Sequence, residues 1–175
     1  GPSMKDYFDE VSYGLLTVNT THYPESEPES NLSYQDEYPR SYYQPYNQVT
    51  NPSGYANDSE RTNREHTLLM NAISFIESEV PDSLNIDADD DGNVDNVTFL
   101  VYGQPGGWAD LLWPHRWSLY SVDVEINGAI VYDYLFMLSE SWYFNVGVLC
   151  HEFFHVLGAP DLYHYDGGGA PSAVG

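Results

Sequence analysis

One short pattern near the end of this 175-residue sequence constrains its fold more than any other feature. The residues from His151 to Asp161 read H-E-x-x-H-x-x-G-x-x-D. The apolar run Val146–Leu157 contains no proline and predicts a buried helix, on which His151 and His155 lie one turn apart on the same face. Gly158 adopts a left-handed backbone conformation without a Cβ clash. It therefore predicts the end of that helix and a turn that brings Asp161 back toward the histidines.

These residue types, in this order, indicate a metal site. Imidazole nitrogens and a carboxylate oxygen suit zinc, and three protein ligands with an open fourth position are typical of catalytic zinc. We therefore expect His151, His155 and Asp161 to bind zinc. His164, or a residue beyond the end of the sequence, is the alternative third ligand. Glu152 lies beside the first histidine. We expect its carboxylate to act as a general base that deprotonates a metal-bound water, which then attacks a peptide carbonyl. An ordinary amphipathic helix with structural histidines would account for the histidines alone.

A second chemical signal is the acidic stretch 87–95, which places carboxylates at alternate positions before and after Gly92. Such an oxygen-rich turn favours a hard cation, calcium before magnesium. The expected ligands are Asp87, Asp89, Asp91, Asn93 and Asp95. The spacing matches the start of an EF-hand loop, but Thr98 stands where an EF-hand has its bidentate glutamate. We expect the ion to fix the entry of the strand that follows. A solvated acidic turn is the alternative, although its carboxylates would then repel one another.

Composition limits the classes of function. The chain has 27 acidic and five basic residues and a formal net charge of −22, which argues against nucleic-acid binding because phosphates would be repelled. We find no signal peptide and no apolar run of membrane length, so we expect a soluble chain with no membrane span. Residues 1–3 are interpreted as the remainder of a cleaved expression tag, and residues 4–175 as one domain. Cys150 is the only cysteine and is predicted to be a buried core residue.

Hydrophobic periodicity predicts an α/β (α+β) fold, in which a helix packs against one face of a twisted mixed sheet. The predicted elements are helices at 4–11 and 65–80, a strand at 15–19 after a turn at Gly14, an irregular excursion held by tyrosines at 21–58, and a central strand at 97–102. Residues 122–126 and 130–138 predict a hairpin across Asn127-Gly128. We expect its second strand, continuing to Glu140, to be an edge that pairs with extended substrate. His115 is expected to have a surface or structural role.

These segments together resemble a known family. The acidic loop, the strand ending in Tyr102-Gly103, the sequence Trp113-Pro114-His115-Arg116-Trp117 and the segment His151–Tyr163 resemble the M6 family of secreted metallopeptidases, of the immune inhibitor A type. The resemblance covers most of residues 4–175, and H-E-x-x-H-x-x-G-x-P-D is its most specific part. It implies a metzincin-like zinc endopeptidase that is secreted or on the cell surface, is stabilised by calcium and cleaves internal bonds of proteins or peptides. By the same resemblance the two histidines and Asp161 correspond to zinc ligands, and Glu152 to the general base.

One departure from this resemblance concerns the floor of the site. Metzincins have a methionine-containing turn beneath the zinc, after the third ligand. Met137 comes too early to supply it, and the sequence ends at Gly175 where that turn is approached. We therefore expect the N-terminal part of a zincin-type catalytic domain, with the C-terminal subdomain largely missing. A catalytically inactive, calcium-stabilised adhesion or binding module on the same fold is the alternative. A calcium-dependent carbohydrate binder, based only on the abundant tyrosine and tryptophan, is a weaker one.

Overall fold

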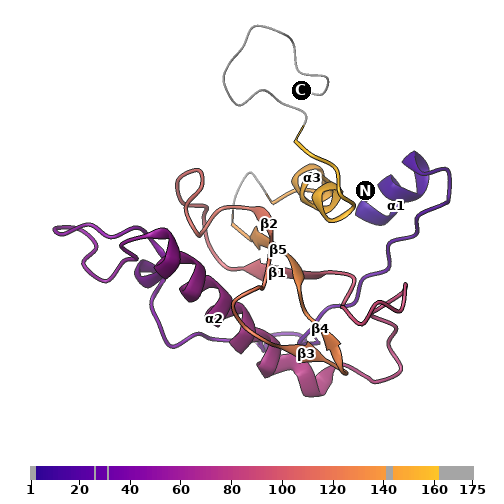
Figure 1. The fold of residues 1–175 in the computed structure, drawn as a ribbon, viewed down its shortest axis with the longest axis horizontal. Coiled ribbons are helices and arrows are strands. Elements are labelled where there is room, and N and C mark those ends of the chain that lie inside the picture. Colours follow the sequence, from indigo (N-terminus) through magenta and orange to yellow (C-terminus); the bar gives the residue numbers. More distant parts are fainter. Residues whose placement is uncertain (1–2, 26, 31, 141–143, 162–175) are drawn as a thin grey trace, which may run out of the picture.

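The computed structural model describes every residue except 1–2, 26, 31, 141–143 and 162–175. The described part has a mixed α/β fold in which helices pack around a small mixed sheet, with a second, two-stranded sheet at one end (Figure 1). The helices are α1 (Met4–Val11), α2 (Asp58–Ile76) and α3 (Val146–Val156), with 3-10 turns at Arg40–Tyr43 and Glu77–Glu79, and the strands are β1 (Val97–Val101), β2 (His115–Ser118), β3 (Glu125–Ile126), β4 (Ala129–Ile130) and β5 (Asp133–Leu138). Over the described residues, no helix is both long and apolar enough to cross a membrane.

The larger sheet has the order β1-β5-β2, so β5 is its central strand. β5 pairs in parallel with β1 and antiparallel with β2, and Phe136 lies opposite both Phe99 and His115. Each residue from Tyr134 to Leu138 is 0 % exposed. A strand that is apolar on both faces belongs in the middle of a sheet, where both faces are covered. The expectation that 97–102 is the central strand is therefore wrong for the described sheet: β1 lies at its edge, and Leu100 is 56 % exposed.

The predicted hairpin forms, but it is much shorter than expected. β3 and β4 pair over two residues each, across Asn127 (φ 49°) and Gly128 (φ 84°). Positive φ at both positions is what a tight two-residue hairpin turn requires. The expected second strand at 130–138 is split, because its apolar second half pairs in the other sheet as β5. The substrate-pairing edge predicted there is therefore wrong as well. β2 is the antiparallel strand whose outer edge has no partner strand among the described residues.

Helix α2 begins seven residues before the predicted start at Glu65. Its first turns are polar, so apolar periodicity does not detect them. Their start is instead fixed by a cap, in which the Asn57 side chain accepts a hydrogen bond of 3.0 Å from the backbone N–H of Glu60. Further along, Leu69 and Ile73 are each 1 % exposed and belong to the main core under the sheet. The backing helix is thus confirmed, with a corrected N-terminus.

Near the N-terminus, α1 is confirmed and lies beside α3 (Figure 1). Phe8 is 1 % exposed, and its ring centroid lies 5.2 Å from that of Phe153 and 5.0 Å from that of Phe154. Cys150 is buried in the same cluster, as predicted. The strand predicted at 15–19 is wrong. Those residues are irregular and pair with no described strand, because the chain crosses there from α1 to the main core without running along a sheet.

The excursion at 21–58 is irregular, as predicted, apart from one 3-10 turn and isolated bridges. Two of its tyrosines, Tyr43 and Tyr55, are buried in the main core.

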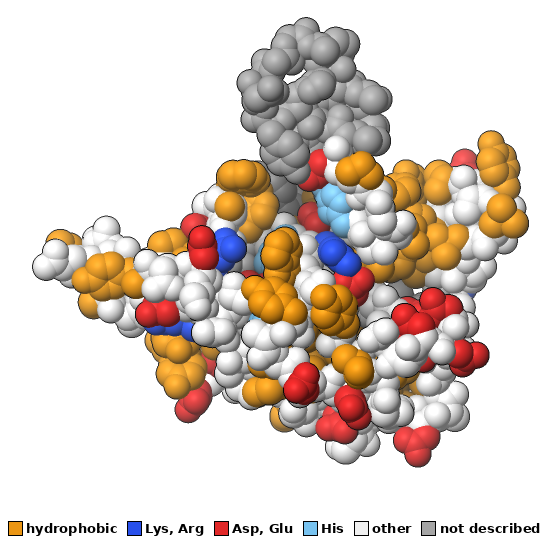
Figure 2. Space-filling view, viewed as in Figure 1, with side chains coloured by type: hydrophobic (Ala, Val, Ile, Leu, Met, Phe, Trp, Pro, Cys, Tyr) orange, Lys and Arg blue, Asp and Glu red, His pale blue; other side chains and the backbone are white. Residues whose placement is uncertain are grey.

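Basic side chains also hold loops in place: Arg64 donates to the carbonyl oxygens of Tyr42 (2.6 Å) and Ser53 (2.8 Å). The other four basic residues also bond within the chain: Lys5 to Asn19, Arg40 to the carbonyls of Tyr102 and Gln104, Arg61 to the carbonyl of Ala109, and Arg116 to Asp133. The face in Figure 2 accordingly shows many acidic side chains and few basic ones.

The packing of α2 gives a test of the fold. Ile73→Ala should lower the free energy of unfolding by about 2–5 kcal/mol, because it leaves a cavity in the core under the sheet. Thr67→Ala, at an exposed position of the same helix, should change it by less than about 0.5 kcal/mol. Urea denaturation followed by circular dichroism measures both. Equal effects of the two substitutions would contradict the packing described for α2.

Candidate metal centre

Helix α3 begins and ends where the sequence predicts. The Asn145 side chain caps it by accepting from the backbone N–H of Val148 at 3.0 Å. At the other end Gly158 has φ 86°, and the N–H of Ala159 donates to the carbonyl of Phe154 at 2.9 Å. This left-handed residue turns the chain sharply back. The helix is less buried than predicted, because only Cys150 and Glu152 are fully buried among its described residues. One side of α3 therefore faces outward, and that side carries the first histidine.

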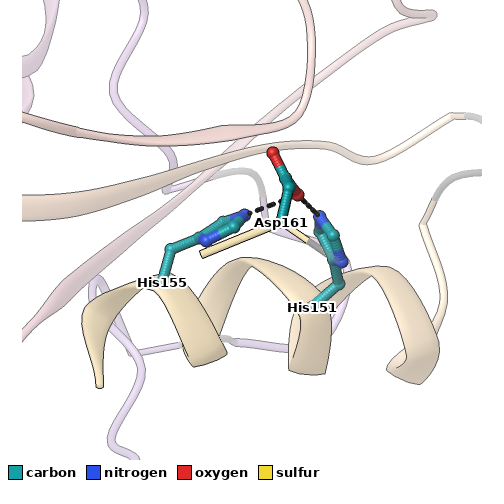
Figure 3. A group of neighbouring side chains, drawn as sticks. All are labelled: His151, His155 and Asp161. Carbon is teal, nitrogen blue, oxygen red and sulfur yellow. Dashed lines mark ion pairs between the residues drawn. The ribbon is translucent and has the colours of Figure 1, made fainter. Parts of the chain in front are cut away.

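The histidines and the aspartate converge as the motif predicts (Figure 3). Both imidazoles rise from the same face of α3, and Asp161 lies between their tips. Its Oδ1 is 3.2 Å from Nε2 of His151 and 3.3 Å from Nε2 of His155. Ligands bound tetrahedrally to zinc at about 2.0–2.2 Å lie roughly 3.3 Å from one another. Both distances from Asp161 match that spacing, and the three donor atoms all lie within 4.8 Å of one another, so the group could hold one metal ion.

The protonation of His155 also suits a metal ligand. Its Nδ1 lies 2.8 Å from the carbonyl oxygen of Ala159, which can only accept a hydrogen bond. Nδ1 therefore carries the proton, and in the neutral ring Nε2 carries a lone pair that points at Asp161. The lone pair of Nε2 and the carboxylate oxygen of Asp161 then face each other at 3.3 Å. Two acceptors at this distance repel each other unless a proton or a cation lies between them. A metal-binding histidine commonly has this arrangement, with its other nitrogen donating to a backbone carbonyl.

Glu152 lies beside this group and is not one of the three converging residues. It is 8 % exposed, one of three buried polar or charged side chains among the described residues. Burial raises the pKa of its carboxyl group, and the nearby Asp161 adds to that effect. The neighbouring histidines His151, His155 and His115 act in the opposite direction. A carboxylate with a raised pKa binds a proton more readily, which suits a general base.

The structure brings together only part of the predicted calcium site. Oxygen atoms of Asp87, Asp89 and Asp95 lie within 4.8 Å of one another. Asp91 and Asn93 are outside this group, and Asp91 instead accepts a hydrogen bond of 2.7 Å from the backbone N–H of Asn93. The loop is tied to the hairpin, because backbone hydrogen bonds join Val94 and Gly92 to Ile130. It then leads into β1 within a few residues, as expected. The alternative zinc ligand His164 lies outside the described residues.

Sequence reasoning missed a buried polar group behind the metal centre. Glu65 of α2 is 6 % exposed and accepts hydrogen bonds from Nε2 of His115 (2.7 Å) and the hydroxyl of Tyr134 (2.6 Å). One signal was available: Glu65 precedes Leu69 by four residues and Ile73 by eight, so it lies on the buried face of the helix. Its partners come from β2 and β5 and are distant in sequence. His115 therefore has a structural contact, in line with the expectation for it.

No protein-family model matches the sequence, and no curated protein matches it significantly.

The burial of Glu152 has a consequence for stability in the metal-free protein. Because the folded-state pKa is raised above its ordinary value, the folded state holds this proton more tightly than the unfolded state does. The stability that Glu152 contributes is therefore present below the pKa of the unfolded state, about 4.3, and is lost as pH rises through the raised pKa of the folded state. We expect Glu152→Gln to be more stable than the wild type at pH 7, and the difference to shrink toward pH 4. Urea denaturation in the presence of a chelator measures it; a less stable variant at pH 7 would contradict the assigned burial.

Proposed function

We propose that this protein is a zinc-dependent endopeptidase that hydrolyses internal peptide bonds of protein substrates. The observation that carries the proposal is the convergence of His151, His155 and Asp161, with a buried glutamate one residue after the first histidine. Two imidazoles and one carboxylate leave a fourth position open on a tetrahedral ion, as catalytic zinc requires. An adhesion or binding module on the same fold would have no use for a buried carboxylate at that position.

The residues present fit this chemistry. Zinc, when bound, polarises the peptide carbonyl and makes water more acidic. Glu152 accepts the proton of the attacking water and then delivers it to the nitrogen of the departing amine. Its burial keeps bulk water from competing for that proton. The carbonyl of Ala159 holds His155 in the tautomer that presents Nε2 to the ion.

Substrate binding is proposed at β2. This strand is the antiparallel edge of the sheet, and α3 packs against both β2 and β5. An extended peptide that adds to the outer edge of β2 would be held by backbone hydrogen bonds beside the metal centre. Main-chain recognition of this kind fixes the position of a peptide with little dependence on its side chains.

The finer assignment follows from the same observations together with the resemblance of the motifs. We propose a metzincin-like fold of the M6, immune inhibitor A type, for which a mixed sheet, a backing helix α2 and a broken active-site helix α3 provide support. A secreted or cell-surface location and a structural calcium ion at the acidic loop belong to the same proposal. The acidity of the chain and the cluster of Asp87, Asp89 and Asp95 support the calcium ion.

The assigned base is tested by Glu152→Gln. We expect the substitution to lower kcat on an unfolded protein substrate by about 100-fold or more, since the amide cannot accept the proton. Zinc content, measured by elemental analysis, should stay at the wild-type level because no ligand is changed. Glu125→Gln, at the exposed first position of β3, is the control and should keep full activity. Wild-type activity in Glu152→Gln, or activity that survives removal of the metal by a chelator, would refute the proposal.

The calcium site is tested by thermal unfolding with and without the ion. Calcium at about 100 times its dissociation constant should stabilise the protein by about 2.7 kcal/mol, because it binds the folded state alone. Asp89→Asn should remove most of this gain, since it takes a charge from the group. Asp90→Asn, one residue away and outside the group, should retain it. The same response to calcium in both variants would show that the loop is a solvated turn.

A further inference from the structure

His115, at the start of β2, is surrounded by acceptors. Its Nε2 is 2.7 Å from Oε1 of Glu65, and its Nδ1 is 2.5 Å from the carbonyl oxygen of Trp113. A carboxylate and a carbonyl can only accept hydrogen bonds, so both ring nitrogens carry protons and the ring is a cation. The hydroxyl of Tyr134 donates to the same oxygen of Glu65, which favours the ionised carboxylate. Glu65 and His115 therefore form an ion pair inside the protein.

The charges around His115 are consistent with this. Burial alone lowers the pKa of the imidazole, but the hydrogen bond and negative charge of Glu65 outweigh it and raise the pKa above its ordinary value. The carbonyl of Trp113 and the charge of Glu152 act in the same direction. The titratable groups that face His115 are thus Glu65 on α2, Tyr134 on β5 and Glu152 on α3. Two of the three carry the opposite charge.

A buried pair of this kind adds little to net stability. Desolvation of the two charges largely cancels their attraction, and apolar residues of similar volume often stabilise a fold as well or better. Here the Glu65 side chain is 8 % exposed and that of His115 is 26 % exposed. The pair instead fixes the position of β2 relative to α2, because its hydrogen bonds hold His115 of β2 against Glu65 of α2.

The pair connects the elements around the proposed site. Glu65 belongs to the backing helix α2, and His115 to the edge strand β2 against which α3 packs. The imidazole also stacks on Phe136 of the central strand, with centroids 5.3 Å apart and planes 10° apart. The next residue, Arg116, bonds sideways to Asp133 at the start of β5. Its contact holds β2 within the sheet, whereas the His115 contact holds the strand against the helix behind it.

We propose that His115 is a positioning residue for the peptidase reaction, and that its ion pair with Glu65 holds the start of β2 where that strand binds the substrate backbone. This inference rests on the proposed function. It assigns His115 no contact with the substrate or the metal; the residue acts through the strand. Loss of the pair should therefore weaken substrate binding more than it slows the chemical step.

The test uses His115→Gln and Glu65→Gln, with Tyr134→Phe as the matched control that removes the other hydrogen bond to the same oxygen. His115→Gln should raise KM for a peptide substrate about tenfold and change kcat less than about threefold. Zinc content should be unchanged. Tyr134→Phe should keep a KM close to the wild-type value, because the ion pair remains.

The pH profile separates positioning from a general loss of packing. His115 is charged below its raised pKa, so kcat/KM of the wild type should fall as pH rises through that value. In Glu65→Gln the ion pair is absent at every pH, so KM should be raised throughout and this fall should be lost, while burial lowers the pKa of His115. The imidazole titration itself, followed by NMR of the zinc-loaded protein, should shift in the same direction and decides the matter if His115→Gln does not fold.

Several outcomes would overturn the inference. These are a wild-type KM in His115→Gln, an equal rise in KM in Tyr134→Phe, and an unchanged imidazole titration in Glu65→Gln. A wild-type protein that binds zinc but cleaves no substrate would instead refute the proposed function. An active wild type with an unaffected His115→Gln variant would refute the positioning role alone.

Discussion

The structure depends on the complete burial of one strand. Tyr134 to Leu138 of β5 are all inaccessible to solvent, and burying five large side chains contributes about 1.5–3 kcal/mol each. This strand can be covered only if β1 and β2 pair on its two sides and other elements cover both faces. Pairing to β5 fixes the edge strand β2, and the helix α3 that follows β5 in the chain packs against both. The candidate metal centre is therefore placed by the strand that leads into its helix.

Acidic groups are buried or partly buried where this scaffold meets α3, and each lies beside at least one histidine. Glu65 has His115 and Tyr134, while Glu152 lies beside three histidines. Asp161 faces one nitrogen of each imidazole, and in His155 the proton is on the other nitrogen, Nδ1. A cluster of acidic groups in an apolar surrounding is costly unless positive charge is near. His115 supplies positive charge beside Glu65, and in our proposal a zinc ion supplies it beside Asp161 and Glu152.

The sequence was informative where structure is local. The helix at 146–156, its end at Gly158 and the return of Asp161 all follow from contacts within about ten residues, and each was predicted. The strand order was not predictable, because apolar runs at 97–101 and 133–138 look alike until their neighbours are known. The strand expected at 15–19 failed for the same reason, since apolar residues alone do not supply a partner. Glu65 and His115 lie 50 positions apart, and no periodic pattern relates them.

The two candidate metal-ligand groups show the same division. In the H-E-x-x-H motif, spacing on a helix fixes the direction of the two histidines, and the turn at Gly158 returns Asp161 to them. In the acidic loop, alternate spacing does not fix direction, because each carboxylate can bond the backbone of the turn instead. Asp91 accepts from the backbone of Asn93 and lies outside the group, whereas Asp87 and Asp95 also accept from backbone N–H groups and still converge with Asp89. Loop geometry is set by the hairpin beside it, through the bonds to Ile130, and that contact is invisible in the sequence.

The outer edge of β2, left unpaired by every described strand, has a cost for a protein in concentrated solution. An open edge can bind the edge of a second molecule as readily as a peptide, and such pairing begins aggregation. Mutual repulsion between molecules that each carry a formal charge of −22 opposes this encounter. The strength of that repulsion falls as salt shortens its range. Colloidal stability and an accessible binding edge are thus linked in this chain, and its acidity lets it keep both.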